Sequence, residues 1–159
     1  MKRELSPSTC HQAEVIAFLS NPASYPGVER VERVETHGNL VFLAGSEAFK
    51  IKRAVRFDYM DFSTLEKRHA ACLREIAVNS RCGADMYLGC VPIYRSETGT
   101  LTFAPPGSIV EWAVRMRRFN QSDLLSTLAA TGQVTRELAP QLAETVFGSH
   151  HGSARACPA

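Results

Sequence analysis

The sequence predicts an α+β fold in which an antiparallel sheet of about five strands carries one inserted helix and is followed by two C-terminal helices. Short runs rich in β-branched and aromatic residues alternate with turn sequences, a pattern typical of antiparallel strands. A helix-start signal interrupts these runs after the third strand. Beyond residue 120 the spacing of apolar residues becomes helical, and Gly132 separates two helical segments.

The N-terminal elements are a helix and three strands. A helix is expected over residues 9–20, with Thr9 as its N-cap. The text VERVERVET at 28–36 repeats valine every three residues, which fits a helix, but its β-branched content favours a strand. The runs at 40–44 and 48–52 predict a hairpin with a three-residue loop.

The inserted helix is expected to begin at a capping box formed by Ser63 and Glu66 and to end near Cys82, with Gly83 as the stop signal. The segments that follow are predicted to be strands at 90–94, 101–103 and 109–116 and helices at about 121–131 and 135–149.

These elements suggest four parts along the chain. Residues 1–27 form an N-terminal helix and turn, and residues 28–119 form the sheet with its inserted helix. Residues 120–151 hold the two later helices, and residues 152–159 lack periodicity, so we expect a loose tail.

Composition excludes several classes of protein. The 159 residues carry 18 basic and 16 acidic side chains, so the net charge of +2 provides no general attraction to nucleic acid or a membrane. Five cysteines without a CxxC pair fit neither a zinc ribbon nor a disulfide framework. No signal peptide or membrane span is evident, and we expect a cytoplasmic protein.

Lys50 and Glu75 are the candidate chemistry-bearing residues. A lysine on the third strand and a glutamate on the inserted helix reproduce the layout of the small lobe of kinases, where the lysine holds ATP phosphates and the glutamate holds the lysine. From spacing alone, an exposed lysine and a glutamate on a helix face explain the pattern better. A resemblance changes that balance.

The run ETHGNLVFLAGSEAFKIKRAVRFDYMDFSTLEKR, followed by EIAVN at 75–79, DMYLGCVPI at 85–93 and WAVRMRRF at 112–119, resembles the opening region of the aminoglycoside-phosphotransferase-like family of bacterial kinase-fold proteins. Members of that family often carry a further C-terminal P-loop kinase domain. The resemblance covers about residues 28–151 and implies a protein-kinase-like small lobe.

The resemblance places Lys50 and Glu75 on the family's lysine and glutamate positions. It further implies that backbone groups near 116–118 pair with adenine, and that the turn around Gly38 lies over the phosphates in place of the usual G-x-G-x-x-G loop. The nucleotide-binding residues expected are Lys50, Glu75, Gly38, Met116, Arg117 and Arg118. A solvated strand end explains the arginines equally well, and RNA binding is the least favoured alternative.

The catalytic half of a kinase fold is not recognisable in this sequence. The word HGN at 37–39 lacks the catalytic aspartate and precedes the lysine strand, and DFS at 61–63 precedes the helix, so both are interpreted as structural. No P-loop text occurs. We therefore assign no catalytic or metal-binding residue, and expect ATP binding that is weak or confined to a full-length context, with magnesium binding unlikely.

Two functional hypotheses follow. The first is a truncated or degenerate kinase-like lobe that binds nucleotide without transferring phosphate. The second is a non-enzymatic interaction module that associates with itself or with a partner through apolar residues that would meet the absent lobe: Phe119, Leu124, Leu125 and Leu128.

Overall fold

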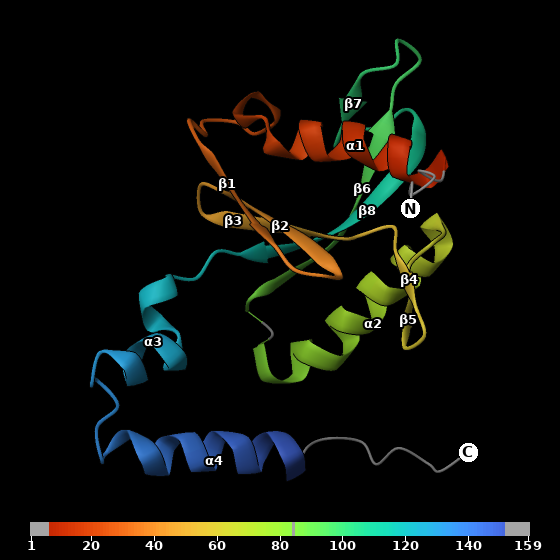
Figure 1. Ribbon diagram of the computed structural model, residues 1–159. Coiled ribbons are helices and arrows are strands. Elements are labelled where there is room, and N and C mark those ends of the chain that lie inside the picture. The colour runs from red at the N-terminus through yellow and green to blue at the C-terminus, as the bar shows by residue number, and fades with distance from the viewer. Residues whose placement is uncertain (1–6, 84, 152–159) are drawn as a thin grey trace, which may run out of the picture. The chain divides into compact units, whose positions relative to one another are not determined.

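The computed structural model describes residues 7–83 and 85–151 and shows a mixed α+β protein built on a six-stranded antiparallel sheet. The sequence predicted this fold class, with about five strands in the sheet. The strand order is β1-β2-β3-β8-β6-β7 (Figure 1). The strands are β1 (Val31–Glu35), β2 (Asn39–Ala44), β3 (Glu47–Lys52), β6 (Tyr87–Arg95), β7 (Leu101–Thr102) and β8 (Ser108–Arg117).

The hairpin of β2 and β3 turns through two residues, Gly45 and Ser46, and the expected three-residue loop was wrong. Glu47 pairs with Ala44 and so belongs to the strand. Gly45 has φ +59°, a left-handed conformation that glycine adopts without steric cost and that permits so short a turn.

One face of the sheet is covered by α1 (Pro7–Ser20) (Figure 1). Val15 and Leu19 of this helix are fully buried in a core with Phe42 and Ile51 of the sheet. Alternate residues of each strand point to the same side, so Phe49 and Ile51 face α1 whereas Lys50 and Lys52 face the other way. A short 3-10 helix, η1 (Pro22–Ser24), follows α1.

The opposite face carries α2 (Leu65–Gly83), which packs over β8, β6 and β3. The residue that caps it is Thr64, whose Oγ1 accepts the Lys67 N–H at 3.3 Å. The expected capping box on Ser63 was wrong because Asp61 Oδ1 accepts both the N–H and the hydroxyl of Ser63, at 3.0 and 2.6 Å.

Between β3 and α2 lies a small hairpin that the sequence did not predict, formed by β4 (Arg56–Phe57) and β5 (Met60–Asp61). The rings of Phe57 and Tyr59 stack at 5.7 Å, and His37 from the β1–β2 turn packs edge-on against both. The hairpin therefore folds against the turn that contains Gly38.

A buried polar network joins the two helices. Glu111 on β8 is 1% exposed and accepts hydrogen bonds at 2.9 Å from Arg68 Nε on α2. Gln12 Nε2 on α1 donates to the same carboxylate at 3.0 Å, and Gln12 also bonds the backbone of Lys52 and Ala54. Glu111 thus links the elements on opposite faces of the sheet.

The described residues 119–151 belong to a second compact unit, divided from the first between residues 118 and 119. Its described elements are η2 (Gln121–Asp123), α3 (Leu125–Ala130) and α4 (Leu138–His151), so the single helix expected over 121–131 is divided. Neither α3 nor α4 buries a described residue, and Phe147 is 67% exposed. The tail expected over 152–159 lies outside the described residues. None of the described helices is long and apolar enough to cross a membrane.

Candidate functional site

The sequence-predicted pair of Lys50 and Glu75 meets in the structure. Lys50 projects from β3 and Glu75 from α2, and Lys50 Nζ lies 2.9 Å from Glu75 Oε1. Lys52 joins the same carboxylate, with its Nζ 2.5 Å from Glu75 Oε2. Lys50 and Lys52 are two residues apart on β3 and therefore lie on the same face of the strand. The single carboxylate of Glu75 bridges them.

The two lysines differ in their surroundings. The Lys50 side chain is 23% exposed, whereas that of Lys52 is 8% exposed. Lys52 Nζ also donates to Asn39 Oδ1 at 3.0 Å and lies 5.6 Å from the centre of the Phe62 ring. Lys52 is held on several sides, and Lys50 is the more exposed of the two lysines.

The carboxylate of Glu75 is held in its charged form. Burial raises its pKa, but the hydrogen bonds from Lys52 and Lys50 outweigh burial, and the net pKa lies below the ordinary value. Two lysine side chains and one carboxylate give the cluster one more basic group than acidic groups. This local excess of positive charge suits an anionic ligand, although the chain as a whole is nearly neutral.

Met116 belongs to the same face of the sheet. Val114 lies directly opposite Lys50 and Met116 directly opposite Ala48, so alternate residues of β8 place Val114 and Met116 on the side of Lys50. Met116 is half-buried, between Ala48 on one strand and Tyr87 on the other. The face thus combines charged groups with an apolar patch at its end.

Gly38 lies beneath the β4–β5 hairpin. A Cβ on Gly38 would lie 2.8 Å from Met60 Cε, so the absence of a side chain makes room for Met60. Its carbonyl accepts the Arg53 N–H at 3.0 Å. The next residue is Asn39, which contacts Lys52, so the turn adjoins the lysine cluster through Asn39.

Arg117 and Arg118 lie where β8 ends, and their backbone N–H groups are used within the sheet. Arg117 N–H donates to the Met86 carbonyl and Arg118 N–H to the Ser46 carbonyl, each at 2.8 Å. The Arg118 guanidinium reaches Glu32 Oε1 on β1 at 3.3 Å. Any pairing with adenine at these two residues would have to use their carbonyl groups or displace sheet bonds.

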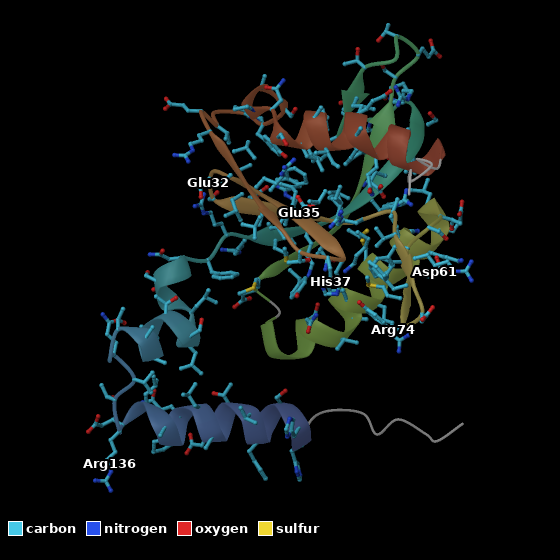
Figure 2. The ribbon with its side chains drawn as sticks, in the orientation of Figure 1. Glu32, Glu35, His37, Asp61, Arg74 and Arg136 are labelled. Carbon is cyan, nitrogen blue, oxygen red and sulfur yellow. The ribbon has the colours of Figure 1, made fainter. Side chains whose placement is uncertain are left out.

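A groove of about 630 Å³ runs beside the cluster, between α2 and the β4–β5 hairpin. Lys52 and Glu75 are among its lining residues, as are Asp61 and Arg74, which are labelled in Figure 2. Asp61 is engaged by Lys67 Nζ at 2.6 Å, and hydrogen bonds from Lys67 and Ser63 hold the pKa of Asp61 well below its usual range. Asp61 thus ties the segment before α2 to Lys67 near the start of that helix, although the helix cap itself is Thr64.

Sequence reasoning missed several members of the site. Asn39 and Lys52 are directly opposite in the β2–β3 hairpin, and a two-residue turn would have predicted their contact. Tyr87 on β6 is near enough that burial and the charge of Glu75 raise its pKa, but no motif marks it. The positions of Phe62 and Cys72 near the lysines depend on how α2 packs against the sheet, which no local sequence pattern indicates.

Comparison with known proteins identifies relatives of much greater length. The chain is 35% identical over 121 residues to "Uncharacterized protein Rv2004c" of Mycobacterium tuberculosis and to "Uncharacterized protein Mb2027c" of Mycobacterium bovis. Each match covers 76% of this chain, and the matched region spans only about a fifth of each relative, 22% of its length. No model of a known protein family and no solved structure matches the chain.

Proposed function

We propose that residues 28–119 form a nucleotide-binding lobe related to the small lobe of aminoglycoside-phosphotransferase-like kinases, and that the lobe binds the phosphates of ATP at Lys50. The observation that supports this proposal is the ion pair of a strand lysine with a glutamate from the helix inserted after that strand. That pair holds ATP phosphates in kinases. The sheet face beside it supplies apolar contact at Ala48 and Met116, as a nucleobase requires.

The proposal concerns binding and does not include phosphoryl transfer. Transfer requires an acidic residue that orients the acceptor and ligands for magnesium. Among the described residues no group of three or more histidine, cysteine or acidic side chains could hold a metal ion. The acidic residue that orients the acceptor and the magnesium ligands would be sought in the longer relatives, outside the region that those relatives share with this chain.

Isothermal titration with ATP and magnesium tests the proposal. Lys50→Ala should weaken ATP binding about tenfold, because a charge-assisted hydrogen bond to phosphate is lost. Arg30→Ala is the matched control, since it removes one positive charge from an exposed position outside the site. Equal affinity in the two variants, or no binding by the unaltered chain at millimolar ATP, would refute the proposal.

A second candidate function is supported by residues 119–151. The absence of buried residues in α3 and α4, with several apolar side chains exposed, indicates that these helices need a partner surface. An interaction module of this kind would associate with itself or with another protein without any catalysis. A monodisperse monomer at high concentration in size-exclusion chromatography with light scattering would exclude self-association.

A further inference from the structure

Cys72 on α2 and Cys90 on β6 are free cysteines whose side chains the structure describes. Cys72 is fully buried, and its Sγ lies 3.9 Å from the Trp112 carbonyl oxygen on β8. Cys90 is half-buried and lies directly opposite Val114, the β8 residue that also opposes Lys50. Directly opposed residues share a face, so the Cys90 side chain is on the α2 side of the sheet.

Both thiols consequently occupy the layer between α2 and the sheet, where each affects the pKa of the other. We propose that Cys72 and Cys90 form an intramolecular disulfide when the protein meets a peroxide, and that this bond fastens α2 to β6. Helix α2 already packs on β6, so the bond would join two elements that are in contact.

The surroundings assign the two cysteines different parts in the reaction. The hydrogen bond from Cys72 lowers the pKa of Cys90, whereas that hydrogen bond and burial raise the pKa of Cys72. Cys90 is also the more exposed of the two and so meets the oxidant first.

The reaction has two balanced steps. The Cys90 thiolate attacks hydrogen peroxide, breaks the O–O bond, and yields a sulfenic acid and hydroxide, so the sulfur is oxidised and the peroxide reduced. The Cys72 sulfur then attacks the sulfenic sulfur, forming the S–S bond and expelling hydroxide. That hydroxide takes the Cys72 thiol proton and leaves as water.

The position of Cys72 links oxidation to the lysine site. Cys72 and Glu75 are three residues apart on α2 and therefore lie on neighbouring turns of one helix face. A bond from Cys72 to β6 holds this part of α2 on the sheet and keeps Glu75 beside Lys50. The consequence for nucleotide binding rests on the proposed function, whereas formation of the disulfide does not.

Mass spectrometry of the full chain tests the disulfide. In a variant with Cys10, Cys82 and Cys157 replaced by serine, peroxide treatment followed by thiol alkylation and trypsin should join peptide 69–74 to peptide 82–95 with loss of two hydrogens. The same variant in concentrated urea and the further variant Cys90→Ser are the controls, and neither should give the cross-link at a comparable rate.

Three results would overturn the proposal: both thiols remain open to alkylation after oxidation, Cys90 is driven to sulfinic acid without a cross-link, or unaltered protein cross-links through other cysteines. A cross-link should also raise the melting temperature by roughly 5–10 °C, because it closes a short loop in the unfolded chain. If the cross-link forms in a protein that binds no ATP, the proposed function fails and the oxidation site stands.

Discussion

At the scale of single residues, Glu75 is the group on which the site depends, since both Lys50 and Lys52 contact its carboxylate. Replacing it with glutamine removes the charge and keeps the shape. The two lysines then repel each other across a half-buried space. Glu75→Gln should lower the free energy of unfolding at neutral pH by about 2 kcal/mol, measured by urea denaturation.

The stability that Glu75 contributes should depend on pH with a definite sign. The folded-state pKa of Glu75 lies below its ordinary value of 4.5, so the unfolded chain takes up a proton first as pH falls. The contribution is complete above pH 4.5 and is lost as pH falls through the folded pKa. The difference between wild type and Glu75→Gln should therefore shrink in acid, and Glu29→Gln, which removes an exposed carboxylate outside the site, is the control.

Gly38 and Gly107 differ in what an added side chain would meet, which is a flexible side chain at Gly38 and a backbone carbonyl at Gly107. A Cβ at Gly38 would meet the mobile end of Met60, whereas a Cβ at Gly107 would lie 2.4 Å from the Arg95 carbonyl oxygen. Gly38→Ala should cost less than about 1 kcal/mol and Gly107→Ala about 2–3 kcal/mol or more. Thermal denaturation of both variants measures the difference, and a more costly Gly38→Ala would contradict this account of the turn.

Residue-level sequence reasoning succeeded where the order of elements matched a known layout and failed where neighbours compete. The pairing of Lys50 with Glu75 was expected from the layout of the kinase small lobe and from the family resemblance, and the two side chains form an ion pair. The N-cap of α2 is Thr64, one residue after the predicted Ser63. Ser63 instead donates its N–H and its hydroxyl to Asp61. Such competition depends on the β4–β5 hairpin, which has no strong signature in the sequence.

At the scale of elements, the network through Glu111 ties α1 to α2. Replacing Arg68 with a neutral residue leaves the buried carboxylate of Glu111 without its ion-pair partner. Arg68→Met should therefore destabilise the protein by about 3–5 kcal/mol, and the double variant Arg68→Met with Glu111→Leu should recover much of that loss. Urea denaturation of wild type, the two single variants and the double variant measures the coupling, and simple additivity of the two changes would contradict it.

The predicted strand ends agree closely with the structure for β2 and β3 but not for β6. The hairpin of β2 and β3 was predicted within one residue of its observed ends, because apolar runs flank a glycine. Strand β6 begins at Tyr87, three residues before its predicted start, and its pairing with β8 shifts between Tyr87 and Gly89. A bulge of this kind reflects the partner strand and leaves no periodic trace in the sequence.

At the scale of the whole molecule, the two units differ in how they are stabilised. The first has a core on one face of the sheet and a packed helix on the other, whereas α3 and α4 bury no described residue. The sequence divided the chain near the same position, since strand-like patterns give way to helical ones near residue 119. The small burial in the later helices could not be predicted, because their periodicity suits a packed surface.

Exposed apolar residues of the second unit predict concentration-dependent association. Phe147 and Val146 are more than half exposed on α4. Phe147→Ser should lower the average mass seen by sedimentation velocity toward that of the monomer, because less apolar surface is available for contact. Glu144→Ser alters an exposed residue of the same helix and is the control, and an equal effect of both changes would argue against an apolar contact.

Strand β8 serves both faces of the sheet, with Glu111 and Ala113 on the side of α1 and Val114 and Met116 on the side of α2. Strand β8 should therefore tolerate substitutions better than insertions. A substitution in β8 disturbs one face, but a single-residue insertion between Ala113 and Val114 reverses the facing of every residue on one side of it. Length variation within this strand should be absent from functional descendants of the protein, while the loops at either end remain free to grow.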